Sequence, residues 1–154
     1  MSYDVIISLH SSRFPEPDSL AKEVSARSAR EGHRLVLPPS FDLRVADGFA
    51  PLDSTGFGFE VMRSPITSKD VDDYLDVCRE NDEEPEDEYL TMLRESDTSI
   101  TFGCQWQNNW EILVARLIGG ALAKLSDGYV CDPQLGVTVR GGYLPRGKRA
   151  ERKR

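Results

Sequence analysis

The segment that most constrains the fold spans residues 98–133, where an apolar helical pattern lies between two short β-rich stretches. From residue 110 to residue 125 the apolar side chains recur at intervals of three and four, the spacing of one buried helix face. We therefore predict a long helix whose apolar side faces the core. The predicted core positions on this helix are Trp110, Leu113, Val114, Leu117, Ile118, Ala121, Leu122 and Leu125.

The boundaries of this helix are also marked in the sequence. Asn108 and Glu111 have the spacing of a capping box, which satisfies two backbone N–H groups of the first turn. Gly128 is placed to end the helix, because glycine readily takes the left-handed conformation found there. The flanking segments 100–104 and 129–131 are apolar and β-rich, which favours strands. The region thus predicts a strand–helix–strand core unit.

Length and composition predict one globular domain. A chain of 154 residues fits a single core. It contains no apolar run near the roughly 20 residues of a membrane span. The first apolar stretch carries Asp4 and no basic residues before it, so we expect a strand and not a signal peptide. Cys78, Cys104 and Cys131 lie far apart with no CxxC spacing, which favours reduced thiols in a cytoplasm over a disulfide scaffold or a metal site.

The first half of the chain predicts alternating strands and helices. Residues 3–9 predict an apolar strand, and Asp18 or Ser19 is predicted to cap a helix that ends at Gly32. Residues 34–37 (Arg-Leu-Val-Leu) then predict a second strand. Such a β-α-β opening would normally have a right-handed crossover and two parallel strands.

The middle of the chain is punctuated by glycine and proline. Residues 40–67 predict a long loop with one or two antiparallel strands, the clearest at 57–62. Thr67 predicts a helix N-cap, and a second short helix is expected from Pro85. A last strand is expected at 136–139.

Together these elements predict an α+β or α/β fold. We expect a mixed sheet of about five or six strands, packed by three or four helices in a single domain. The globular domain should span residues 1–144. Residues 145–154 are expected to form a disordered basic tail.

Charge is distributed unevenly along the chain. Residues 70–97 hold thirteen acids against only Arg79 and Arg94, a net charge of −11, whereas residues 140–154 carry a net charge of +6. Two interpretations of the acidic segment remain open: a solvated helix pair, or a surface that attracts a basic protein partner. The candidate partner-binding residues are Asp72, Asp73, Asp76, Glu80, Asp82, Glu83, Glu84, Glu86, Asp87 and Glu88, with Trp106 as a candidate aromatic anchor.

The basic tail offers the only route to nucleic acid that the sequence contains. Its six cations after Pro145 are able to contact phosphates. It lacks the interleaved aromatic residues of single-strand binders. We therefore expect a solubilising end, with phosphate contact and docking on the acidic segment of the same or a second chain as the alternatives.

Recognised catalytic motifs are missing from the sequence. It contains no GxGxxG, Walker, GxSxG or HExxH pattern. His10 and His33 are expected at opposite ends of the sheet, and no cofactor or metal is predicted. Cys104 and Cys131 are expected on adjacent strands. The alternative function is a small enzyme with its site at the strand ends near Cys104 and Asp132.

The core unit, mainly residues 98–134, resembles a known group of proteins. Residues 121–128 (ALAKLSDG), followed by 129–134 (YVCDPQ), resemble the closing helix and strand of small bacterial proteins that include immunity proteins of polymorphic toxin systems. The resemblance implies a cytoplasmic, non-enzymatic inhibitor that binds one cognate toxin. It transfers no functional residue, because such proteins share a scaffold and differ on the surface that meets the toxin.

Overall fold

The structure is a computed structural model that describes residues 2–53, 55–105, 109–133 and 137–141. Within these ranges the strands are β1 (Ser2–Leu9), β2 (Gly48–Pro51), β3 (Gly58–Pro65), β4 (Thr98–Gln105), β5 (Tyr129–Asp132) and β6 (Val137–Arg140). The helices are α1 (Pro17–Arg30), α2 (Ser68–Glu80), α3 (Asp87–Glu95) and α4 (Asn109–Ser126), with a short 3-10 turn η1 (Ser11–Arg13). No helix in the described ranges is both long and apolar enough to span a bilayer.

The described strands form one sheet in the order β2-β3-β4-β1-β5-β6. Every neighbouring pair is antiparallel. The predicted single α+β domain is therefore confirmed, with the correction that the sheet is antiparallel and not mixed. Strand β1 lies in the centre, paired with β4 on one side and β5 on the other.

The β-α-β opening is the main error of the sequence prediction. Residues 34–37 form no strand. Leu35 and Leu37 are buried and Val36 is 70% exposed, an alternation that imitates a strand. The backbone N–H of Leu35 instead donates to the hydroxyl oxygen of Ser28 in α1, at 2.9 Å. Both edges of β1 are already occupied by β4 and β5, so no parallel partner can join it.

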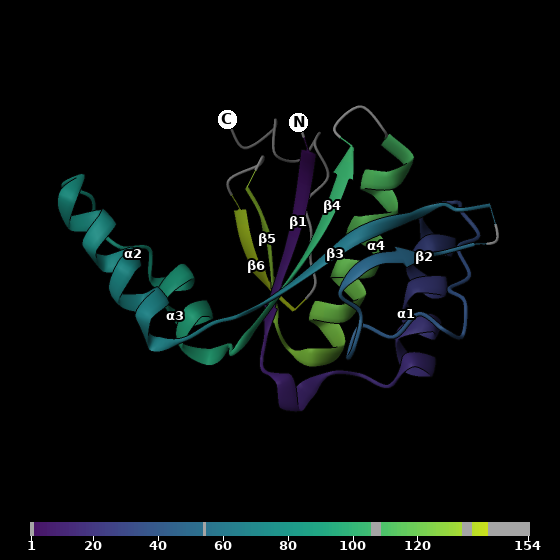
Figure 1. Cartoon of the computed structure of the whole chain (residues 1–154), viewed down its shortest axis with the longest axis horizontal. Helices are drawn as coiled ribbons and strands as arrows, with labels where there is room; N and C mark the ends of the chain where they lie inside the picture. Colours follow the sequence, from purple (N-terminus) through teal and green to yellow (C-terminus); the bar gives the residue numbers. More distant parts are fainter. Residues whose placement is uncertain (1, 54, 106–108, 134–136, 142–154) are drawn as a thin grey trace.

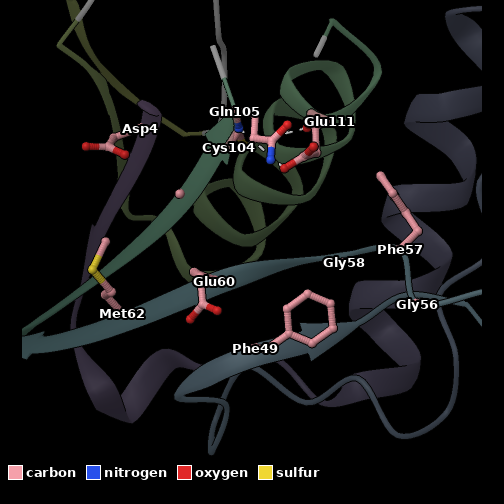
Figure 2. A pocket seen from close by; sticks show the side chains of 11 residues that line it. Asp4, Phe49, Gly56, Phe57, Gly58, Glu60, Met62, Cys104, Gln105 and Glu111 are labelled. Atoms are coloured by element: carbon pink, nitrogen blue, oxygen red, sulfur yellow. Dashed lines mark hydrogen bonds between the residues drawn. The ribbon is translucent and has the colours of Figure 1, made fainter. Parts of the chain in front are cut away.

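The two faces of the sheet are covered differently. Helices α1 and α4 pack together, and α4 covers one face of β1, β4 and β5. Helix α3 contacts β1 from the opposite face, and α2 packs on α3, so that this helix pair projects to the left of the body in Figure 1. The same opposite face carries an open hollow over β1–β4 (Figure 2).

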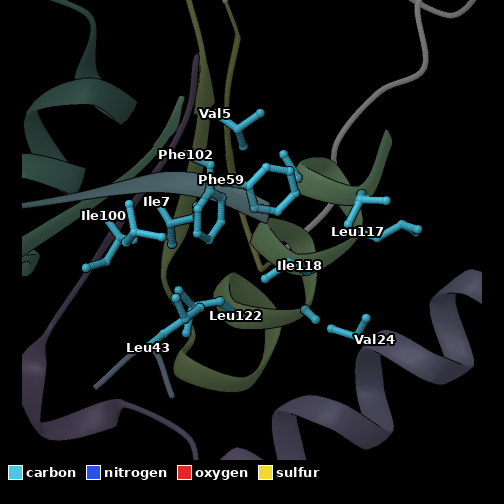
Figure 3. Close-up of a cluster of buried hydrophobic side chains, with 14 of the residues drawn as sticks. Val5, Ile7, Val24, Leu43, Phe59, Ile100, Phe102, Leu117, Ile118 and Leu122 are labelled. Atoms are coloured by element: carbon cyan, nitrogen blue, oxygen red, sulfur yellow. The ribbon is translucent and has the colours of Figure 1, made fainter. Parts of the chain in front are cut away.

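The core lies between α4 and the sheet. Figure 3 shows Ile118 and Leu122 of α4 facing Val5 and Ile7 of β1, and all four side chains are fully buried. Gly119 permits this close packing, because a Cβ atom there would lie 3.1 Å from the Ile7 Cδ1 atom. The predicted buried face of the central helix is correct at Val114, Leu117, Ile118, Ala121 and Leu122.

The two ends of the predicted apolar stripe do not belong to the core. Trp110 is 41% exposed and Leu125 is 39% exposed. The Trp110 ring packs edge-on against His33, with ring centroids 5.2 Å apart. Both ends of the predicted apolar stripe therefore remain partly in solvent.

Helix α4 ends differently from the prediction. Its last residue is Ser126, and Asp127, not Gly128, takes the left-handed conformation with φ of +53°. Gly128 donates its N–H to the carbonyl of Ala123 at 2.8 Å. A Cβ atom on Gly128 would lie only 2.7 Å from the Ser8 carbonyl oxygen. Glycine is therefore needed at position 128 because the backbone of β1 lies so close to it, and not because the position requires a left-handed conformation.

Other boundaries agree within a few residues. The N-cap of the first helix is Glu16, two or three residues before the predicted cap, and the helix predicted from Pro85 begins at Asp87. Thr67 is the N-cap of α2 as predicted, and its N–H donates to the Asp70 carboxylate at 2.7 Å. The strand predicted at residues 57–62 corresponds to β3, and β2 is its antiparallel neighbour within the segment predicted to hold one or two such strands. Strand β6 also matches its prediction.

Candidate protein-binding site

Helices α2 and α3 with their linker, residues 68–95, form what we call the acidic arm. All ten acids predicted to bind a partner lie on this arm, and all ten are exposed. Trp106, the predicted aromatic anchor, lies outside the described residues, as does the basic segment 145–154.

Apolar contacts attach the acidic arm to the body. Met92 and Leu93 of α3 are buried against Tyr129 of β5, with Ile66 and Val71 packed around them. This attachment holds the base of the arm in place. Most of α2 is left in solvent, where Cys78 is its one buried residue.

The two helices of the arm are joined by a pair of tyrosines. The rings of Tyr74 and Tyr89 pack with their centroids 4.6 Å apart. The Tyr74 hydroxyl oxygen accepts the backbone N–H of Glu86 at 3.0 Å. In the linker, Asp82 takes a left-handed conformation, which turns the chain back toward α3. The arm therefore presents its carboxylates on an ordered scaffold.

Few of these carboxylates have a cation nearby. Asp73 pairs with Lys69 at 2.9 Å, and Asp76 pairs with Arg79 at 3.0 Å. The other eight candidate acids make no ion pair within the described ranges. Exposed pairs of this kind contribute little to stability. The arm therefore keeps a strong negative field that extends over roughly one Debye length, about 8–10 Å.

The residues of the alternative enzyme site lie in a different part of the molecule. Cys104 on β4 stands opposite Tyr3 on β1. The Tyr3 hydroxyl donates to the fully buried Asp132 carboxylate at 2.5 Å. An Arg116 nitrogen from α4 lies 3.3 Å from the same carboxylate and also donates to the Tyr3 oxygen. Cys104 and Cys131 are not on adjacent strands, contrary to the prediction, because β1 lies between β4 and β5.

This cluster is built as a buried polar contact. Burial and the carboxylates of Glu111 and Asp4 raise the pKa of the Cys104 thiol to about 12, so the thiol stays protonated at neutral pH. A protonated thiol is a poor nucleophile. The Asp132 carboxylate is occupied by Tyr3 and Arg116. The geometry therefore gives no support to a reaction in which the Cys104 thiol is the nucleophile. Within the described ranges no three His, Cys, Asp or Glu side chains are grouped as metal ligands.

The Tyr3 hydroxyl predicts a fall in stability in alkali. Burial, with the hydrogen bond to Asp132, raises its pKa from 10.0 to about 12. Above about pH 10 the unfolded chain loses this proton while the folded chain keeps it, so the free energy of unfolding should fall as pH rises toward about 12. Urea unfolding across this range measures the slope. Tyr3→Phe should make the slope shallower, whereas an unchanged slope would contradict the assignment.

Sequence reasoning missed the polar cluster and the open hollow. Tyr3 and Arg116 lie 113 positions apart, and neither belongs to a motif. The hollow is lined by residues from four strands together with Gly56, Phe57 and Glu111, and the strand residues meet through the strand register. The sole available signal was a glycine, Gly103, inside a predicted strand.

Comparison with known proteins yields no relative from which a function could be transferred. No family model, curated protein or solved structure matches the chain. The function therefore has to be argued from the acidic arm and the rest of the geometry.

Proposed function

We propose that this protein is a non-enzymatic binding protein whose acidic arm docks a basic protein partner. The resemblance of residues 98–134 to immunity proteins makes a cognate protein toxin the partner that we propose, inside a bacterial cytoplasm. One observation carries the proposal: ten exposed acids lie on a helix pair and its linker, which project together from the body. A surface of this kind accelerates encounter with a basic protein.

The spacing of the acids supports docking over mere solubility. Asp72, Asp76 and Glu80 follow one another at intervals of four along α2, so their side chains lie on one helix face. Like charges at that spacing destabilise an isolated helix. A solvated helix commonly alternates acids with lysines, which relieves this repulsion. A basic partner would provide the same relief on binding.

Charge reversal tests the proposal. The variant with Asp82, Glu83, Glu86 and Asp87 changed to lysine should bind the partner more slowly, by on the order of tenfold or more, because long-range attraction sets the encounter rate. Its association rate should also depend less on salt. The partner is first captured from the native host and identified by mass spectrometry. Stopped-flow association is then measured at several salt concentrations.

A matched variant controls for net charge alone. Glu16, Asp18, Glu31 and Asp47 are exposed acids outside the arm, and their reversal to lysine changes the net charge equally. This control should retain most of the association rate. Equal slowing of the two variants, or an arm variant that associates like wild type, would exclude the acidic arm as the docking surface. Circular dichroism confirms that both variants are folded.

A further inference from the structure

Four residues on four neighbouring strands form a row across the open face of the sheet. Phe49 of β2 stands opposite Glu60 of β3, Glu60 opposite Gly103 of β4, and Gly103 opposite Asp4 of β1. Residues paired in this way point to the same face. Across the row, an aromatic ring is therefore followed by a carboxylate, a position without a side chain, and a second carboxylate.

The gap at Gly103 is not required by the packing of the described chain. Its backbone has no positive φ. A Cβ atom there would meet the Glu60 Cβ at 3.8 Å and the Asp4 Oδ1 atom at 4.0 Å, which are ordinary contacts. Glycine inside a strand weakens the strand and often marks a place where another group approaches closely. Its effect here is a bare patch of backbone between two carboxylates.

This row forms part of a hollow of about 870 Å³. Figure 2 shows Phe49, Phe57 and Met62 as its apolar walls, with Asp4, Glu60 and Glu111 contributing carboxylates. The described residues that line it include no lysine, arginine or histidine. The hollow thus combines negative charge with apolar and aromatic surface.

We propose that this hollow binds an arginine side chain presented by a polypeptide. Asp4 and Glu60 stand two strand spacings apart, about 10 Å, and a guanidinium group over Gly103 has donors to reach toward both carboxylates. The apolar stem of arginine would lie against Met62, which is two residues from Glu60 on β3 and therefore on the same face of the sheet. The site is distinct from the acidic arm, and the inference does not depend on the function proposed for the arm.

The surroundings of the hollow favour a polypeptide over a small molecule. Phe49 is 54% exposed, Met62 49% and Val45 75%. Phe49 lines both the hollow and the adjacent depression that includes Val45. Large apolar side chains exposed beside a charged pocket are typical of protein interfaces, where aromatic residues anchor the contact.

A blocked peptide with the sequence Arg-Leu-Arg-Leu serves as the probe. Its titration into the isotope-labelled protein should shift the amide resonances of Gly56, Gly58 and Gly103. The same peptide with citrulline in place of arginine keeps the shape and removes the charge, and it should bind about tenfold more weakly or worse. Equal binding of the two peptides would overturn the proposal. So would free arginine amide that binds as tightly as the peptide, because a polypeptide would then be unnecessary.

Three variants locate the binding. Gly103→Ala should fill the gap and weaken peptide binding by about tenfold without lowering the melting temperature, since alanine is better suited to a strand interior. Glu60→Gln should weaken binding similarly, whereas Glu80→Gln on the acidic arm should not. The quadruple arm reversal should leave the glycine shifts intact. Loss of those shifts in the arm variant, or their persistence in Gly103→Ala and Glu60→Gln, would overturn the assignment.

Discussion

Replacement of Leu122 by alanine is expected to lower the free energy of unfolding by about 2–5 kcal/mol. Leu122 is fully buried between α4 and the sheet. Truncation removes its apolar contacts and leaves a cavity, because the surrounding strands can relax only in part. Urea unfolding of the purified chain measures the change. Leu117→Ala should have an effect in the same range, since Leu117 is 7% exposed on the same helix face.

Leu125 provides the matched control for this prediction. It belongs to the same helix and is the same residue type, yet it is 39% exposed. Leu125→Ala should therefore cost much less than Leu122→Ala, because little additional surface is removed from water in the folded state. Equal losses at the two positions would show that the buried face of α4 has been assigned incorrectly.

Replacement of Asp132 by alanine is expected to cost about 3–5 kcal/mol, as breaking a buried ion pair generally does. Asp132 is fully buried and accepts hydrogen bonds from Tyr3 and Arg116. Removal of this carboxylate leaves the guanidinium of Arg116 and the hydroxyl of Tyr3 largely buried and without the acceptor that they share. Thermal or urea unfolding measures the loss.

An exposed ion pair controls for charge removal in general. Asp73 lies 2.9 Å from Lys69 on α2, and both side chains are largely in solvent. Asp73→Ala should change stability by only about 0.5 kcal/mol. A cost at Asp132 as small as that at Asp73 would mean that solvent or other groups replace the carboxylate, and that the Tyr3–Arg116–Asp132 cluster is not important for folding.

The sequence predicted those elements whose signal is local. The apolar period of α4, the Thr67 cap and the strand β3 each depend on neighbouring residues, and each was predicted from them. Residues 34–37 were wrongly predicted to be a strand, because exposed and buried side chains also alternate in an extended loop that packs against the core. Trp110 was wrongly predicted to be buried, because periodicity gives the direction of a side chain and not how much of it the neighbouring elements cover.

Of the two candidate sites, the acidic arm could be predicted from the local sequence and the hollow could not. The exposure of the ten acids on the acidic arm followed from the density of charge, since buried acids without partners are rare. The row from Phe49 to Asp4 was not predictable, because it depends on the register of four strands that are distant in the sequence. Such registers are set by tertiary packing and not by local propensity.

The central position of β1 has a consequence for synthesis. This strand is synthesised before either of its partners, because Leu9 pairs with Thr98 of β4, about ninety positions later in the chain, and β5 follows later still. At roughly 5–20 residues per second, an apolar strand therefore waits for several seconds without a partner. During that interval Val5, Ile7 and Leu9 are exposed to other nascent chains, so we expect production of soluble protein to depend on chaperones or on slow expression at low temperature.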